Sequence, residues 1–142
     1  MLEEASISIV LGTGTHRIED NEFAHVVTEA VGNMFPEDPP LFLARTPHGY
    51  NHEPTIQADL EAGGYSAPAA FEALEARSRA ASCEAPAIAY CQGTPLRNEI
   101  EARDPSRLAE ATERAAAAIR DRFGSTDVDA KIRGYVITAT KL

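Results

Sequence analysis

The stretch 41–65, LFLARTPHGYNHEPTIQADLEAGGY, combines a proline turn, two histidines and a short helix, and the rest of the chain is arranged on either side of it. Pro47 breaks any helix that approaches the first histidine. Pro54 suits the first turn of a new helix, and the glycines 63–64 suit its end. The stretch therefore predicts a shaped turn followed by one short helix.

The composition predicts one globular domain over residues 1–142. The chain is 44% hydrophobic and 25% charged, and a chain of this length buries roughly two thirds of its unfolded surface in one core. Its formal charge of -9 repels phosphate backbones and anionic lipid. We therefore expect no nucleic acid and no membrane among its partners.

The two cysteines, Cys83 and Cys91, are eight residues apart, which matches neither a CxxC redox pair nor a zinc knuckle. We expect both to be buried thiols in a reducing compartment. No apolar run approaches the roughly 20 residues of a membrane span, and no signal-peptide pattern opens the chain. These features predict a cytoplasmic protein.

The pattern along the chain predicts strands at both ends. Residues 6–11 alternate β-branched and polar side chains before a glycine loop, and residues 130–140 alternate in the same way. Residues 20–32 have helical apolar spacing, with Asp20 as the expected N-cap. Three prolines within 36–40 then exclude a helix or a central strand.

The middle of the chain predicts three more helices and one ambiguous segment. Ser82 begins a helix that ends near Gln92, Thr94 caps the next one, and Asp104 starts the longest, which ends at Gly124. For residues 69–77 the alanine and glutamate content favours a helix, whereas the turn before them favours a strand.

Four sequence runs together carry a family resemblance: FPEDPPLFLARTPHGY, IQADLEAGGY, AYCQGTPLRNEIEARDP and GYVITATK. They resemble the C-terminal half of a class I S-adenosylmethionine-dependent methyltransferase, over residues 20–142. The resemblance implies that residues 59–65 close a helix before the sixth strand, and that a seventh strand, antiparallel to the rest, ends the chain. It decides residues 69–77 in favour of a strand. The expected fold is α+β, a small mostly antiparallel sheet of about three strands with four to five helices.

The resemblance also implies S-adenosylmethionine as cofactor, but its binding motif is absent from this chain. In the family the cofactor site uses a first strand, a glycine-rich loop and an acidic residue that ends the second strand. Gly12 and Gly14 imitate such a loop, but Arg17 stands at the third glycine position. We therefore expect a substrate-side half that is not self-sufficient in cofactor binding. The alternative is a non-catalytic small-molecule-binding or dimeric assembly module.

The candidate site residues come from the same stretch. His48 and His52 are four apart, but the intervening turn breaks the helix that a metal site would need, so no metal is expected. The resemblance places the insert that carries His48 and Tyr50 toward the substrate. Arg45 and Arg97 are candidate substrate-binding residues because a guanidinium group binds a carboxylate through two donors. We expect His48 and Tyr50 to shape a pocket wall or cap the turn. The alternative for His48 is a general base, because imidazole titrates near neutral pH. For both arginines the alternative is an ordinary salt bridge.

A homodimer is the expected assembly. Half of a doubly wound sheet leaves a strand edge and apolar faces open, and such an edge pairs readily with another strand. We expect the strand 7–11 or the helix that starts at Asp20 to form the contact.

Overall fold

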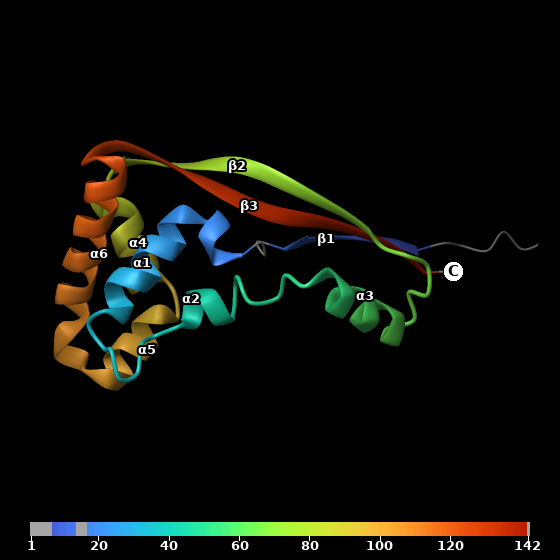
Figure 1. The fold of residues 1–142 in the computed structure, drawn as a ribbon, viewed down its shortest axis with the longest axis horizontal. Helices are drawn as coiled ribbons and strands as arrows, with labels where there is room; N and C mark the ends of the chain where they lie inside the picture. Colours follow the sequence, from blue (N-terminus) through green and yellow to red (C-terminus); the bar gives the residue numbers. More distant parts are fainter. Residues whose placement is uncertain (1–6, 14–16, 142) are drawn as a thin grey trace, which may run out of the picture.

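The structure is a computed structural model that describes residues 7–13 and 17–141. These residues form an α+β fold, as predicted, with one antiparallel sheet (Figure 1). Its strands are β1 (Ile7–Thr13), β2 (Ala70–Ser82) and β3 (Thr126–Lys141). The helices of the described residues are α1 (Glu22–Gly32), α2 (Phe42–Arg45), α3 (Glu53–Ala62), α4 (Glu84–Gly93), α5 (Leu96–Arg103) and α6 (Leu108–Phe123), with 3-10 turns η1 (Ile18–Asp20) and η2 (Pro105–Arg107).

Strand β3 lies at the centre of the sheet and is antiparallel to both neighbours. β1 and β2 therefore run in the same direction, and the last strand runs against them. The strand prediction for residues 69–77 is confirmed, and both β2 and β3 are longer than predicted. Gly12 pairs with Val136, so it is a strand residue and the predicted loop there is wrong. Gly14 lies outside the described residues.

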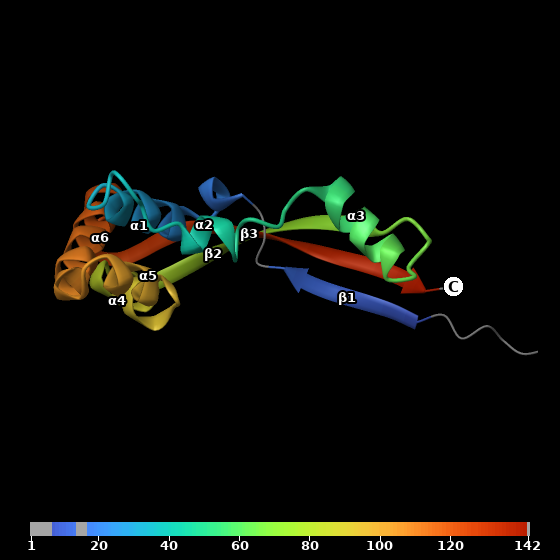
Figure 2. The ribbon, with the colours of Figure 1, turned by 90° about the horizontal axis from the view of Figure 1, so that it is seen from below.

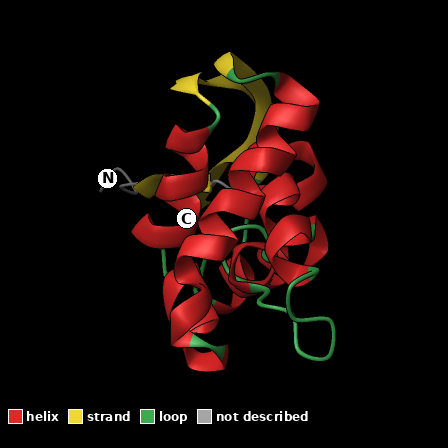
Figure 3. Ribbon diagram, turned by 90° about the vertical axis from the view of Figure 1, so that its left-hand side faces the viewer, coloured by secondary structure: helices red, strands yellow, loops and turns green. Residues whose placement is uncertain are grey.

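The larger hydrophobic core lies at one end of the sheet. Helices α1, α4, α5 and α6 pack against one another and against the start of β3, and Figure 3 shows these helices stacked in front of the strands. Their fully buried side chains include Phe23, Val27, Ile100 and Ile119. The predicted apolar stripes of α1 and α6 therefore face this core.

The smaller core lies at the other end, where α3 covers the last part of the sheet (Figure 2). It consists of Ile56 and Leu60 from α3 with Ile137 and Ala139 from β3. The larger core instead uses the even-numbered positions 128 and 130 of β3. Because successive side chains of a strand point to opposite faces, the two ends of β3 bury opposite faces of one strand.

Where β1 ends, side chains take over its pairing with β3. The amide oxygen of Asn21 accepts from the backbone N–H of Arg133 at 3.2 Å, and Glu22 Oε2 accepts from the N–H of Lys131 at 2.6 Å. These backbone donors would otherwise have no strand partner. The predicted N-cap of α1 was Asp20, but that residue ends η1 and the helix follows Asn21.

Several helix starts differ from the prediction by a few residues. Ser82 ends β2 instead of capping α4, which follows Cys83. α5 begins at Leu96, yet the predicted cap works as expected, because Thr94 Oγ1 accepts from the Leu96 N–H at 3.2 Å. Residues 42–45 form the single helical turn α2, which the sequence did not predict. Pro54 does stand in the first turn of α3.

Two further sequence predictions concern the helical end. Both cysteines are buried and free, as expected, and burial raises the pKa of Cys91 to about 11. The longest helix is α6, and its start is marked by Asp104, whose side chain accepts from the backbone N–H of Ser106. Gly124 follows the helix with a φ of 93°, a conformation that favours glycine.

Candidate functional site

A polar hollow of about 470 Å³ lies between the two ends of the molecule. Its walls come from η1 and the residue before it, from the start of α3, and from the middle of β3. The lining includes Arg17, Asp20, His52, Glu53, Arg133 and Tyr135. The segment 41–65 thus contributes one wall, through residues 51–54.

The turn that leads into this wall is held by its own backbone. The N–H of His48 donates to the carbonyl oxygen of Leu43 at 3.1 Å, and the side-chain amide of Asn51 donates to the carbonyl of His48 at 2.8 Å. A Cβ atom on Gly49 would lie 2.0 Å from the carbonyl oxygen of Arg45. Only glycine therefore fits the tightest point of this turn.

None of the four residues predicted to bind substrate lines this hollow. Arg45 forms an ion pair with Glu99, and Arg97 forms one with Glu101 at 3.0 Å. The salt-bridge alternative thus describes both arginines in this structure. The carboxylates of both pairs, Glu99 and Glu101, lie on α5.

The other two predicted residues take part in the turn and in α3. The hydroxyl of Tyr50 donates to Oδ2 of Asp59 at 2.5 Å, and this hydrogen bond, more than burial, raises the pKa of Tyr50. The Nδ1 atom of His48 is buried within the turn. Both residues shape the segment that carries the wall of the hollow, and their roles toward a substrate stay predictions.

The charges of the hollow are arranged around Tyr135. Burial, and then the hydrogen bond and negative charge of Glu53, raise the pKa of its hydroxyl, while Arg133 and Arg17 act in the opposite direction. Asp20 is 3.4 Å from the Lys131 ammonium group. The acidic groups of the hollow therefore have partners within the chain.

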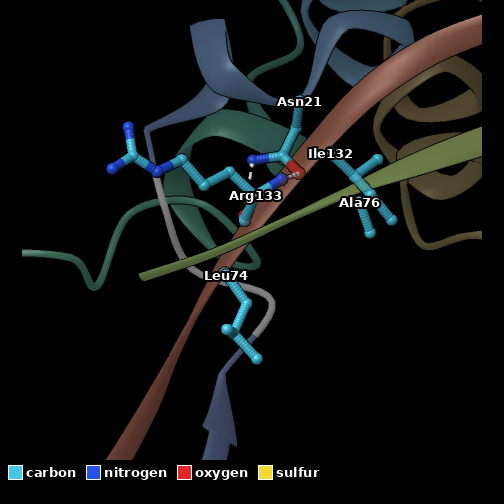
Figure 4. Close-up of a pocket in the computed structure, with 6 residues that line it drawn as sticks. Asn21, Leu74, Ala76, Ile132 and Arg133 are labelled. Carbon is cyan, nitrogen blue, oxygen red and sulfur yellow. Dashed lines mark hydrogen bonds between the residues drawn. The ribbon is translucent and has the colours of Figure 1, made fainter. Parts of the chain in front are cut away.

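Asn21 fixes the backbone on two sides of the hollow. It is 6% exposed, and it is the only buried polar residue within residues 17–141. Its Nδ2 donates to the carbonyl oxygen of Arg17 at 3.2 Å. Its Nδ2 also donates to the carbonyl oxygen of Arg133 at 3.2 Å, and its Oδ1 accepts from the Arg133 N–H (Figure 4). One buried amide thus ties η1 to the middle of β3.

An apolar hollow of about 190 Å³ lies beside this amide. Figure 4 shows Leu74 and Ala76 of β2 and Ile132 of β3 around it. Leu74 is 49% exposed. The lining of this apolar hollow contains no charged residue other than Arg133. It is therefore suited to apolar packing and holds no candidate catalytic group.

The described part of the GxG pattern does not form a cofactor-binding loop. The one glycine of the GxG pattern that the structure describes, Gly12, lies inside β1 and pairs with Val136, so it forms no loop for a cofactor to approach. These residues therefore support no chemical step that uses this cofactor. The described residues also contain no group of three or more His, Cys, Asp or Glu side chains placed to hold a metal ion.

No family model matches the chain, and a search of curated proteins found no similar sequence. The methyltransferase resemblance therefore stays a prediction. Among the helices of the described residues, none combines the length and apolar character needed to cross a bilayer.

None of the residues that line the hollow was predicted as a ligand-binding residue, and the three that matter most for its chemistry are Arg17, Arg133 and Tyr135. One signal was present, because positions 131, 133 and 135 share one face of an alternating strand. Two basic side chains on one strand face are typical of a solvated face. A tyrosine in the same register was the sign of a partly covered one.

Proposed function

We propose that this chain forms the substrate side of an S-adenosylmethionine-dependent small-molecule methyltransferase, with the cofactor bound by a part of the enzyme outside residues 7–141. The polar hollow would hold the methyl acceptor. The segment 41–65, which the resemblance assigns to the substrate side, supplies one of its walls.

The observation that carries the proposal is the direction of the strands. β1 and β2 run one way, and β3, the last element of the chain, runs the other way between them. A final strand antiparallel to the others is what the resemblance implies for this family. α3 also ends at glycines 63–64 before β2 begins, as the same resemblance implies.

The free edge of β1 is the place where the rest of such a sheet would join. In the described part of the chain β1 pairs with β3 alone. Its other edge therefore offers backbone N–H and C=O groups to a further strand. A cofactor-binding half that pairs here would lie next to the hollow, because β1 ends opposite Tyr135.

The test is methyl transfer by the assembly that the chain forms in its own cells. The tagged chain is purified under native conditions and incubated with S-adenosylmethionine carrying a tritiated methyl group and a small-molecule extract. We expect transfer of label by the assembly and no cofactor binding by the isolated chain in calorimetry at millimolar cofactor. An assembly that neither binds the cofactor nor transfers label contradicts the proposal.

A second candidate function, a dimeric binding or assembly module, is favoured by the same free edge. The predicted contact through the helix after Asp20 has little support, since the apolar face of α1 is covered within the chain by Phe23, Val27 and their neighbours. The edge of β1 remains as the proposed homodimer contact. A light-scattering mass of one chain at micromolar concentration would exclude it. For both candidate functions we propose a cytoplasmic location, in keeping with the two free thiols.

A further inference from the structure

Arg17 and Arg133 both line the polar hollow. Within residues 17–141, neither of them forms an ion pair with a carboxylate. The other arginines each lie 3.9 Å or less from a carboxylate oxygen: Arg45, Arg77, Arg79, Arg97, Arg103, Arg107, Arg114, Arg120 and Arg122. The chain has 22 acidic residues against 13 basic ones. Carboxylates are in excess, and yet in this part of the chain the two guanidinium groups at one hollow are paired with none.

The backbones that carry these two arginines are fixed relative to each other. The buried side chain of Asn21 holds the carbonyl oxygens of both residues at 3.2 Å. Its Oδ1 also accepts from the N–H of Arg133. The two cationic side chains therefore extend from fixed backbone positions. This lowers the conformational entropy that is lost when both bind one ligand.

The surrounding charges restrict the kind of anion that fits. The carboxylate of Asp20 lies 3.4 Å from the ammonium group of Lys131, and the carboxylate of Glu53 forms a hydrogen bond with the Tyr135 hydroxyl. Both carboxylates nevertheless line the hollow and repel a multiply charged ligand such as a phosphate dianion. Two guanidinium groups against two partnered carboxylates suit a ligand with a single negative charge.

We propose that Arg17 and Arg133 bind the carboxylate of a small organic molecule in the polar hollow. A guanidinium group binds a carboxylate through two parallel N–H donors, and two such groups fix both the position and the orientation of the ligand. As the substrate class of a methyltransferase this assignment rests on the proposed function. The binding site itself does not, and it is tested without cofactor.

The test is a titration of the full chain with benzoate, followed by the NMR signals of the backbone amides. Benzamide, which has the same shape without the charge, is titrated in parallel at constant ionic strength. We expect benzoate to shift the signals of Arg133 and Tyr135 and benzamide to leave them unchanged. No shift with benzoate at millimolar concentration, or equal shifts with both compounds, overturns the proposal.

Three substitutions assign the binding to these arginines. Arg17→Gln and Arg133→Gln are each expected to weaken benzoate binding by about tenfold or more, because each removes a charged bidentate donor. Arg97→Gln is the matched control, because it changes the chain by the same charge at the ion pair with Glu101. Arg133→Lys, which keeps the charge and loses the fork, should fall between wild type and Arg133→Gln.

The outcomes of these variants separate the alternative interpretations. Equal weakening in the Arg97 variant would mean that only the net charge matters, and it contradicts the site. Unfolding of a variant is detected from the dispersion of its amide signals, and Arg133→Lys then decides, since it keeps the charge and much of the length of the side chain. If benzoate binds as expected and the native assembly transfers no methyl group, the carboxylate site stands and the methyltransferase proposal falls.

Discussion

The two ends of β3 are covered in different ways. At its start, Val128 and Ala130 enter a core built by helices α1, α4, α5 and α6. At its end, Ile137 and Ala139 form a small core with two buried residues of α3, and partly buried side chains such as Phe71 pack against it. The same strand therefore belongs to one core that contains many buried side chains and to another that contains four. Figure 1 shows several helices at one end of β3 and α3 at the other.

The difference indicates which end of the molecule contributes most to the stability of the fold. Stability from apolar burial scales with the area removed from water, so the helical end has most of it. The α3 end is covered by one amphipathic helix and is flanked by the free edge of β1. A further strand or domain that packed at this end would add most to the buried apolar area and so to stability. The polar hollow lies between the two, where the buried face of β3 changes from even to odd positions.

The largest expected effect comes from the helical end. Ile119→Ala removes a fully buried side chain from α6 and leaves a cavity among several helices. We expect a loss of about 3–5 kcal/mol in the free energy of unfolding, measured by urea denaturation. A loss below about 1 kcal/mol would show that this core does not dominate stability.

The matched change at the α3 end is Ile56→Ala, where the side chain is 2% exposed. Because this core is separate from the larger one, we expect it to open without the rest of the chain, with a loss of about 2 kcal/mol that appears as local opening. Hydrogen exchange should speed up in α3 and at positions 137–139, while α6 keeps its protection. Equal acceleration in α6 would mean that the two ends unfold as one unit.

The link that Asn21 forms between η1 and the middle of β3 is tested by Asn21→Ala. It removes three hydrogen bonds of a buried amide and leaves the Arg133 N–H without its partner. We expect a loss of about 1–3 kcal/mol in thermal or urea unfolding, together with weaker benzoate binding. Asn33→Ala, at the exposed end of α1, is a control that should cost much less. Unchanged benzoate binding would contradict the positioning role of Asn21.

The smallest effect is expected on the exposed side of the sheet. Asp129 accepts hydrogen bonds from Arg77 at 2.7 Å and Arg79 at 3.0 Å, and these lower its pKa below the usual value. A carboxylate with a lowered folded-state pKa stabilises the protein at neutral pH and loses that contribution as the pH falls below about 4. Asp129→Asn should therefore flatten the acid side of a plot of melting temperature against pH. An unchanged acid side would show that this bridge contributes nothing.

Local sequence rules predicted most of the elements because local physics decides them. The prolines and glycines around α3, the apolar stripes of α1 and α6, and the alternation in β3 each act within a few residues. Residues 70–82 are different. Their composition favours a helix, and they form a strand because β3 supplies the pairing partner along the whole length.

The candidate site was the part that local rules could not place. Arg17 and Arg133 are 116 positions apart, and the contacts of Asn21 and its neighbours with β3 bring them to one hollow. The predicted residues Arg45 and Arg97 satisfied the same chemical criterion, but α5 supplies both with carboxylates. Whether an arginine is available to a ligand depends on its neighbours in space, which the spacing of charges along a chain does not give.

Hydrogen exchange along β3, measured by NMR with and without benzoate, tests the contrast between the two ends and the hollow between them most directly. We predict the strongest protection at Val128 and Ala130, weaker protection at Ile137 and Ala139, and an increase on adding benzoate that is centred on Arg133 and Tyr135. Uniform protection along the strand, or a benzoate effect located at the α2–α5 junction around Arg45, would contradict it.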